Sequence, residues 1–526
     1  MSSALAGTGL LVRTALRTGW RAAAVWVLGL VLLYLITGLS IASLYDTPEK
    51  LATYSASLGE SMVMLNGRVA GLDTLGGVLA NEFAPIASFA IPIMAIALTA
   101  RSTRGEEETG RLELLLSART GRLAPVAAAL VVVAGVFLLL GAGVWAAGLA
   151  LPVDRSGAAW YVAALVATGW VYAAATAVLA QVLAHNRTVW AVGLAVAGLT
   201  LVTRGIGDTN ENWVSWTSPL GWQGSVRPFG DPSAVPLLLA VVVAGALAAV
   251  ALWLAGRRDV GAGMVPTRTG PATASRWRAS GPGVAVHQHL GAVVGWTVGV
   301  VALMTMYGAL MNVVVEAITA NPDLAAFLVD SPALVDSIAQ TFVVFAGILA
   351  AGFVLQSLGG LRAEETSGRL ELTLATGRSR WSWLAAHAAI VAAGSVLVVV
   401  AGAAAFAAST ALSLDDPAVG GRILAAGLWQ LPAVLVFVGV SSALFGLLPR
   451  LQVLAWAPFA LGVVVSFLGP SLRLSAGQMR LSPFSAVGEV LTGPVNSRGV
   501  ALLLLVAAGL LAAGLIAFRR RDVPRT

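Results

Sequence analysis

The stretch AAALVVVAGVFLLLGAGVWAAGLAL, residues 127–151, contains 25 residues and no charged side chain. A helix needs roughly 20 mainly apolar residues to cross a bilayer, so this stretch alone predicts a transmembrane helix. Comparable runs lie elsewhere in the chain, for example from Ala22 to Ser40 and from Ala501 to Phe518. Of the 526 residues, 58% are hydrophobic and 11% are charged, against roughly 45–50% and 25% in soluble domains. The sequence therefore predicts an all-α polytopic membrane protein.

The apolar runs predict about twelve transmembrane helices. We expect them at about residues 20–43, 82–100, 123–150, 158–184, 188–203, 234–255, 291–314, 340–359, 382–411, 422–448, 453–469 and 499–518. An even number of spans places both termini on the same side of the membrane. The positions of the basic residues can then test the orientation.

The charge distribution favours termini in the cytoplasm. In that orientation the inner segments hold 23 arginines, whereas the outer segments hold 9 basic residues and 16 of the 25 acidic residues. The excess of positive charge on the inner side is the pattern that the positive-inside rule describes. We interpret the sequence pI near 10.4 as a basic cytoplasmic rim beside anionic lipid, and not as nucleic-acid binding.

Two glutamate-rich loops form the clearest internal repeat. The first, after the second span, reads RGEEETGRLELLL from Arg104 to Leu116, and the second, after the eighth span, reads RAEETSGRLELTL from Arg362 to Leu374. Ten of the 19 positions from 104 to 122 are identical to those 258 residues later. Such self-similarity is typical of membrane carriers built from two related halves.

Two further anchors keep nearly the same spacing. Ser218-Pro219 corresponds to Ser482-Pro483, and the sequence RRDV at 257–260 returns at 520–523. The chain therefore predicts two parallel six-helix repeats, residues 1–260 and 286–526. They are joined by a cytoplasmic linker at 261–285 that is rich in Pro, Gly, Ser and Arg.

Each glutamate-rich loop predicts a short helix with a charged start. Carboxylates are stabilised at a helix N-terminus, where they meet unpaired amides and the positive end of the dipole. Leu112, Leu115 and Leu116 then recur at helical spacing. A charged end and an apolar stripe suit docking to a cytoplasmic partner. A single copy is more often a solvated loop held by Glu–Arg pairs, and the occurrence of two copies at the same topological position favours docking.

The chain carries no nucleotide-binding motif of the P-loop type. That motif needs a lysine before Ser or Thr to reach the phosphates, whereas the single lysine, Lys50, lies in TPEKL on the outer side. If ATP drives this protein, the ATPase is a separate subunit, and ATP and magnesium bind there. We find no nucleophile motif, expect no enzyme activity, and assign no catalytic residue.

Other chemistry is weakly supported. Ion-driven carriers hold ionisable residues inside the membrane, and here Glu82, Glu316 and His387 fall near the ends of predicted spans, where their charged or polar tips can reach the interface. His287 and His289 form a pair without further obvious ligands, so we expect no metal site. A membrane enzyme would require grouped outer carboxylates, and nothing in the sequence groups them.

Three tryptophans, Trp213, Trp216 and Trp222, cluster before the sixth span. They fit either an interfacial aromatic belt or a contact with an amphiphilic substrate. The residues that bind substrate stay unknown at this stage, because an Ala-, Val-, Leu- and Gly-rich bundle does not distinguish pocket residues from packing residues.

The chain resembles the ABC-2 type permeases of high-GC bacteria, a family of polyketide-antibiotic and multidrug exporters. The resemblance covers the whole chain. It rests on the twelve-span double layout, the twin EE-x-x-GRLEL loops, SPLGW at 218–222 with RPF at 227–229, and RRDVG at 257–261. The twin loops are its most specific part.

The resemblance implies how the two loops act. In that family the loop after the second span is a coupling helix that contacts the ATPase. This implies ATPase coupling for the following residues: Glu106, Glu107, Gly110, Arg111, Glu113, Glu364, Glu365, Gly368, Arg369 and Glu371. It also implies two copies of a cytoplasmic ABC ATPase, a bacterial cell membrane, and export of hydrophobic or amphiphilic small molecules such as antibiotics.

A proton-coupled secondary transporter of major-facilitator-like layout is the alternative, since that class shares the six-plus-six topology. It predicts transport that collapses with the proton gradient and needs no ATPase. The repeated glutamate-rich loops do not match that class's Gly and Asp-Arg loop pattern.

Overall fold

The computed structural model describes residues 4–57, 63, 66–110, 120–259, 261–265, 273, 275–277, 279–319, 332–469 and 474–522. Among them, twelve helices are long and apolar enough to cross a membrane, and there is no β-strand. The prediction of an all-α polytopic membrane protein is confirmed. The chain forms two compact units, Met1–Thr269 and Gly270–Thr526. The assignment of 261–285 as a linker stays a prediction.

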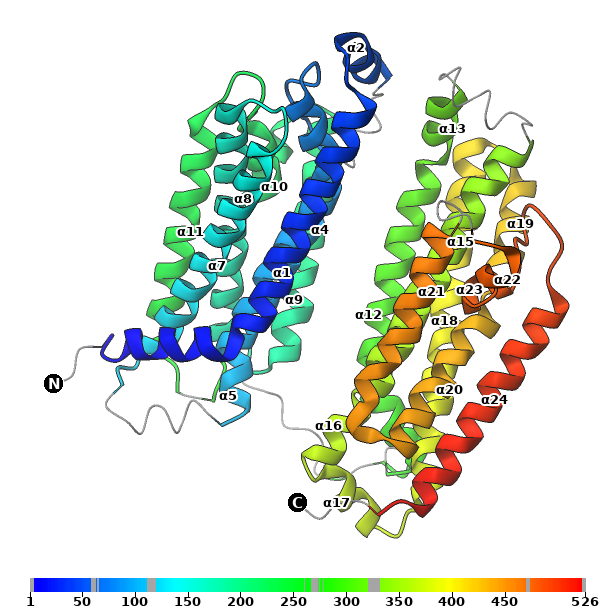
Figure 1. Cartoon of the computed structure of the whole chain (residues 1–526). Helices are drawn as coiled ribbons and strands as arrows, with labels where there is room; N and C mark the ends of the chain where they lie inside the picture. Colours follow the sequence, from blue (N-terminus) through cyan, green and yellow to red (C-terminus); the bar gives the residue numbers. More distant parts are fainter. Residues whose placement is uncertain are drawn as a thin grey trace. The chain divides into compact units, whose positions relative to one another are not determined.

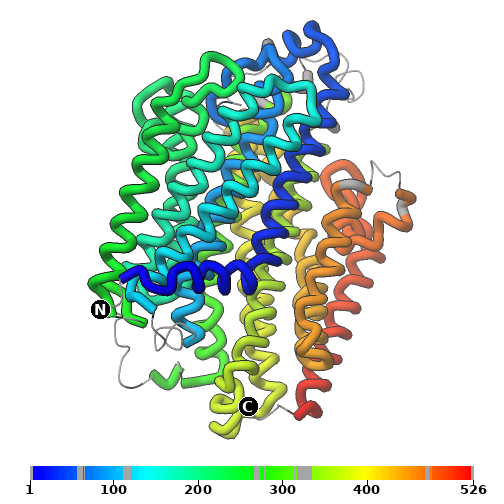
Figure 2. Tube along the Cα trace, turned by 60° about the vertical axis from the view of Figure 1, so that its left-hand side comes forward, coloured from blue at the N-terminus to red at the C-terminus, as the bar shows by residue number. Residues whose placement is uncertain are grey.

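Unit 1 is a bundle of long helices with short segments at both ends (Figure 1). Its elements are α1 Thr8–Leu44, α2 Pro48–Ser57, α4 Leu75–Ala100, the π-helical turn η1 Arg101–Gly105, α5 Glu106–Glu108, α7 Ala124–Leu149, α8 Arg155–Val182, α9 Asn186–Thr209, the 3₁₀ turn η2 Trp213–Thr217, α10 Pro219–Ser225 and α11 Ala234–Ala255. In Figure 1 the short segments α2 and α10 lie at one end of the bundle and α5 at the other. In Figure 2 the first turns of α1 lie across the end of unit 1 that carries α5, before the helix turns along the bundle.

Unit 2 follows a similar order. Its elements are α12 Gly281–Ala309, α13 Met311–Thr319, α15 Pro332–Gly359, α16 Leu361–Thr366, α17 Arg369–Ala375, α18 Arg380–Leu414, α19 Pro417–Leu428, α20 Leu431–Leu447, the 3₁₀ segment η3 Pro449–Ala455, α21 Trp456–Leu468, α22 Ala476–Met479, α23 Pro483–Ala486 and α24 Ser497–Arg520. Each unit thus holds six of the twelve spanning helices.

Aromatic side chains fill the interior of each bundle. In unit 1, Tyr34 packs edge-on against Phe83, with ring centroids 5.2 Å apart. In unit 2, Phe437 and Phe484 stack at 5.6 Å. Edge-on and offset ring pairs add stabilisation to their burial. The outward apolar side chains of α1, such as Val25, are exposed, as expected for a surface that faces lipid.

Several predicted spans differ from the observed helices. The helix α1 begins at Thr8 and not near residue 20, and α12 begins at Gly281 and not near residue 291. The predicted span 188–203 stopped just before Arg204, but α9 continues to Thr209 and buries Arg204. The charge is tolerated because Asp208, one turn later on α9, carries the opposite charge, and because Arg204 also donates to the Ser88 hydroxyl at 2.8 Å. The predicted span 422–448 is two helices, α19 and α20, separated near Gln430. Pro432 stands in the first turn of α20, where its missing N–H is best tolerated.

Candidate functional site

The first glutamate cluster lies at the end of a long helix, and not at the start of a short one as the sequence predicted. Glu106–Glu108 form the last turn of the helix that begins as α4 and passes through the π-helical turn η1. A carboxylate at a helix C-terminus meets the negative end of the dipole. These carboxylates therefore need cationic or N–H partners, and the structure supplies both.

Glu107 lies between two arginines. Arg104 in η1 donates to it at 2.6 Å, and Arg258, which follows α11, donates to both of its oxygens, once at 3.0 Å. The side chains of Arg104, Glu107 and Arg258 are only 1%, 5% and 6% exposed. We call these three residues, with Arg122, the first ion cluster.

Neutral groups complete the first ion cluster. Arg258 donates to the side-chain oxygen of Gln181 at 2.7 Å, and Arg104 donates to the carbonyl of Ala180 at 2.7 Å. Arg122, before α7, donates to the Arg258 carbonyl at 2.6 Å. Buried charges persist when they are paired and their remaining donors are satisfied. The cluster thereby fixes the ends of α4, α8 and α11 to one another.

Glu108 binds a different helix. Its carboxylate accepts a hydrogen bond at 2.8 Å from the backbone N–H of Asn186, the first residue of α9. This is the favourable contact between a carboxylate and a helix N-terminus. The sequence predicted such a contact for the glutamates, but in the helix that follows them. Here it joins the end of the second span to the start of the fifth.

Unit 2 repeats the arrangement. Glu365 contacts Arg362 at 3.0 Å and Arg521 at 3.2 Å, and Arg380 donates to the Arg521 carbonyl. These four residues form the second ion cluster, which occupies the positions of the first in the sequence repeat. Their environment differs. The Arg362, Glu365 and Arg521 side chains are 30%, 3% and 16% exposed.

The partners of the distal arginine also differ between the clusters. Arg521 lies over the rings of Phe445 and Phe518, with its guanidinium carbon 5.4 and 5.3 Å from their centroids. Within the described part of the chain its Nε has no hydrogen-bond partner, whereas the Nε of Arg258 donates to Gln181. A cation–π contact takes the place of a hydrogen bond in the second ion cluster.

The outer part of the second loop is more exposed. Gly368, which directly precedes α17, has φ of +74°, and Gly110 has φ of +71° at the same place in the first loop. A positive φ suits glycine, so both turns depend on it. Arg369 makes a two-fold contact with Glu364 at 3.0 and 2.8 Å, and this hydrogen bonding raises the pKa of Arg369 above its usual range. Leu372 on α17 is 73% exposed.

The predicted coupling residues therefore divide into two groups. The carboxylates of Glu107 and Glu365 are buried within the chain. Glu106, Glu364, Arg369 and Glu371 keep part or all of their surface. Arg111 and Glu113, with the predicted helix that begins near Leu112, lie outside the described residues. The predicted short helix after the glutamates is present in unit 2 as α17. Coupling to an ATPase stays a prediction for the whole set.

The sequence did not single out the arginines that pair with the glutamates. Arg258 and Arg521 belong to the repeated RRDV anchor, which was the available signal, but their distance along the chain hid the contact. His387 is buried and its ring lies 2.9 Å from that of His289, so the prediction that its tip reaches the interface is wrong. No group of three or more His, Cys, Asp or Glu that could hold a metal occurs within the described part of the chain.

An apolar cavity lies beside the first loop. Its volume is about 490 Å³, and its wall includes Leu11 and Trp20 from α1, Val132 from α7, and Arg101 and Glu106 at the end of the second span. A cavity of this size suits a drug-sized molecule. Its apolar wall with charged groups at one end would suit an amphiphile.

Comparisons with known proteins identify the family of the chain. The family model described as "Multidrug efflux system permease Rv1217c, C-terminal domain" matches residues 11–254 and 279–519, one segment in each unit. The chain is 33% identical over 538 aligned positions to the multidrug efflux system permease protein Rv1217c of Mycobacterium tuberculosis (strain ATCC 25618 / H37Rv). That alignment covers 99% of this chain and 96% of the relative.

Proposed function

This chain belongs to the multidrug efflux system permease family, and from that premise we propose that it is the permease subunit of an ATP-driven ABC-2 type exporter. Its substrates would be hydrophobic or amphiphilic small molecules, including antibiotics. A separate ATPase, in two copies, would bind the glutamate-rich loop of each unit and would carry the ATP and magnesium.

The observation that carries this proposal is the repeated ion cluster. Each glutamate-rich loop is fixed by a buried glutamate to arginines at its own start and beyond the last helix of its unit, through Glu107 in one and Glu365 in the other. Burying charges is expensive unless the geometry is maintained. Maintaining it at the same place in both halves suits two equivalent docking points, as two copies of one ATPase require.

The clusters also suggest how movement would be transmitted. An ATPase pair that closes on ATP would displace both loops. Because the first ion cluster joins the loop to the ends of α8 and α11, a displaced loop would carry these helices with it. The permease would then alternate between inward- and outward-facing states, as in other carriers built from repeats.

Orientation and direction belong to the same proposal. The basic end of each unit would face the cytoplasm of a bacterial cell, with both termini there. The cavity beside the first loop would then open near the inner leaflet. A substrate dissolved in that leaflet could enter the cavity from the membrane, and export would follow.

The first experiment is purification of the tagged chain in mild detergent, with identification of whatever accompanies it by mass spectrometry. A stoichiometric P-loop ATPase whose hydrolysis rises with added drug is the expected result. The double variant Leu372→Glu with Arg369→Glu, which places negative charge on the exposed face of α17, should release the ATPase. The control Arg155→Gln should not, because Arg155 begins α8 at the end of unit 1 away from its glutamate-rich loop. Reversal of Glu107 or Glu365 is a poor test, because it would unfold the ion clusters.

The result that would overturn the proposal is a chain that purifies alone and transports drug in vesicles on a proton gradient without any ATPase. That outcome would establish the secondary-transporter alternative, and the two loops would then serve only to hold each bundle together.

A further inference from the structure

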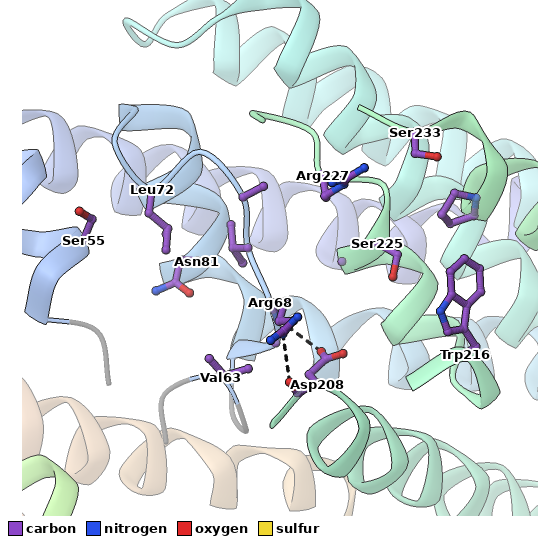
Figure 3. Close-up of a pocket in the computed structure, with 15 residues that line it drawn as sticks. Ser55, Val63, Arg68, Leu72, Asn81, Asp208, Trp216, Ser225, Arg227 and Ser233 are labelled. Atoms are coloured by element: carbon purple, nitrogen blue, oxygen red, sulfur yellow. Dashed lines mark hydrogen bonds between the residues drawn. The ribbon is translucent and has the colours of Figure 1, made fainter. Parts of the chain in front are cut away.

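A second cavity lies at the opposite end of unit 1 from the glutamate-rich loop. Its volume is about 620 Å³, within the range of small-molecule sites. Figure 3 shows its wall, which combines charged side chains with apolar ones such as Val63 and Leu72. All of its lining residues belong to unit 1.

The charge of the wall is positive. Arg68, Arg227 and Asp208 line the cavity, and Asp208 is already compensated. Its carboxylate accepts from the backbone N–H of Arg68 at 3.3 Å and from the Ser215 hydroxyl, and Arg204 stabilises its charge from one turn earlier on α9. The charge of the wall that is least compensated therefore belongs to an arginine.

The guanidinium groups of Arg68 and Arg227 differ in how many hydrogen bonds and ion pairs they make within the chain. Arg68 donates to the carbonyl of Asp208 at 3.1 Å and pairs with Glu211 at the rim. The Arg227 guanidinium has its nearest carboxylate, Asp231, at 3.8 Å, and Asp231 is 92% exposed. Such an exposed pair contributes little. Among the described residues the guanidinium of Arg227 makes no hydrogen bond, so its fork of N–H donors is available to a ligand.

The backbone of Arg227 has a strained, left-handed conformation. Its φ is +52°, and a left-handed conformation costs a residue with a β-carbon roughly 1–2 kcal/mol. The following residues anchor the turn: the ring of Phe229 lies so close to Gly76 and Gly157 that a β-carbon at either would come within 2.4 Å of it. Strain of this kind is typical of functional sites. The backbone of the RPF sequence at 227–229 is thus fixed by packing and is not a loosely held loop.

The rest of the wall suits an apolar body. Trp216 from η2, Leu72 and Val69 from the loop before α4, and Pro236 from α11 all line the cavity. Asn81 and Ser225 add a few hydrogen-bonding groups. A ligand with an anionic head and an apolar body matches this combination, since guanidinium groups bind carboxylate and phosphate in two-fold fashion.

We infer that this cavity is a binding site for an anionic amphiphile, whose carboxylate or phosphate group binds Arg227 beside Arg68 and whose apolar body lies against Trp216 and Leu72. Two sources supply that chemistry: an anionic lipid of the adjoining leaflet, or a transported amphiphile that carries a carboxylate. Unit 2 offers no equivalent, because the chain after Ser482-Pro483 has no arginine before Arg498.

The test uses the purified full-length chain, without an ATPase, in phosphatidylcholine nanodiscs. The probe is a hexadecanoic acid that bears a photoreactive diazirine, and its control is the amine with the same chain and diazirine. We expect the acid to label peptides that contain Leu72 or Trp216 at least about tenfold more than the amine, because a charge-assisted contact is involved. Since no ATPase is present, the result does not depend on the proposed coupling.

Variants locate the binding group. Arg227→Asn removes the guanidinium while asparagine tolerates the left-handed backbone, and it should lower the labelling by about tenfold. Arg227→Lys should retain most of it. Arg155→Gln, at the same end of unit 1 but outside the cavity, is the matched control and should change nothing. Should Arg227→Asn fail to fold, Ser225→Phe, which fills the cavity, should abolish the labelling instead.

Competition identifies the source. If phosphatidylglycerol added to the nanodisc displaces the probe from these peptides, the site takes a lipid headgroup. If it does not, and soluble decanoate displaces the probe, the site takes a smaller free amphiphile. Equal labelling by the acid and the amine would overturn the inference, as would full labelling of a folded Arg227→Asn protein.

Discussion

The two ion clusters share their chemistry and differ in their surroundings. In unit 1 the glutamate and both arginines are buried, and Gln181 accepts from the distal arginine. In unit 2 the proximal arginine, Arg362, borders an open cavity, and aromatic rings surround the distal one. Both halves share a glutamate between two arginines. They differ in the groups that surround the distal arginine and in the exposure of the proximal one. The second cluster is the one that water reaches more easily.

The largest expected effect comes from removing the central carboxylate. Glu107→Gln would leave Arg104 and Arg258 buried without a counter-charge, at a cost of about 3–5 kcal/mol. Glu365→Gln should cost less, about 1–3 kcal/mol, because water can reach Arg362. The thermal unfolding midpoint of the detergent-solubilised chain measures both. Addition of Arg258→Gln to Glu107→Gln should restore part of the loss, and equal losses in the two single variants would contradict the difference between the clusters.

The next effect tests the partner of the distal arginine. Gln181→Leu removes the oxygen that accepts from the Arg258 Nε, and the loss of a hydrogen bond to a charged group should lower the unfolding free energy by about 1.5–3 kcal/mol. In Phe445→Leu the lost cation–π contact accounts for about 0.5–2 kcal/mol. Denaturant titration followed by tryptophan fluorescence compares them. A larger loss in Phe445→Leu would mean that ring packing, and not the hydrogen bond, maintains these sites.

A smaller effect tests the contact that only unit 1 makes. Glu108 binds the N-terminus of α9, whereas its counterpart Thr366 bonds to its own helix at Arg362. Glu108→Thr should therefore lower stability by about 0.3–1 kcal/mol, and the loss should shrink at high salt, which screens the dipole. Thr366→Glu should bring no comparable gain. The same unfolding midpoints, measured at low and high salt, decide between these outcomes.

The smallest effect on stability is expected at the exposed face of α17. Leu372→Glu should change the unfolding free energy by no more than about 0.5 kcal/mol, since the side chain makes few contacts. The same variant should nevertheless weaken retention of the ATPase during purification. If Leu372→Glu instead unfolds the purified chain, Leu372 is packed against another part of the protein even when no ATPase is bound.

The sequence predicted the fold well because each span carries its own signal. Apolar runs identified the twelve spans, and the identity of the loops at 104 and 362 identified the repeat. Boundaries failed where a buried charged residue bonds to a distant part of the chain, as at Arg204, which donates to Ser88 116 residues earlier. The cation at 258 could not be matched to Glu107 for the same reason, since 151 residues separate them.

The candidate site was therefore predicted in place but not in detail. The glutamates were expected to face a partner from the start of a helix, whereas two of them face inward from the end of one. Helical spacing cannot reveal this, because a C-terminal carboxylate is unfavourable until the arginines that neutralise it are known. Gln181 is the partner of the distal arginine in unit 1, and aromatic rings take its place in unit 2. This difference arises from tertiary packing, and no local sequence pattern predicts it.

The chain separation inside each ion cluster also governs its biosynthesis. Glu107 is translated 151 residues before the arginine that neutralises it, and Glu365 precedes Arg521 by 156. At about 5–20 residues per second, each glutamate remains without its second arginine for roughly 8 to 30 seconds. Each half can close its cluster only when its sixth helix has left the ribosome and entered the membrane. A nascent chain that stalls before that helix leaves each glutamate paired only with the arginine at its own start, Arg104 or Arg362. An unfinished half therefore lacks the contact that joins its loop to the end of its sixth helix.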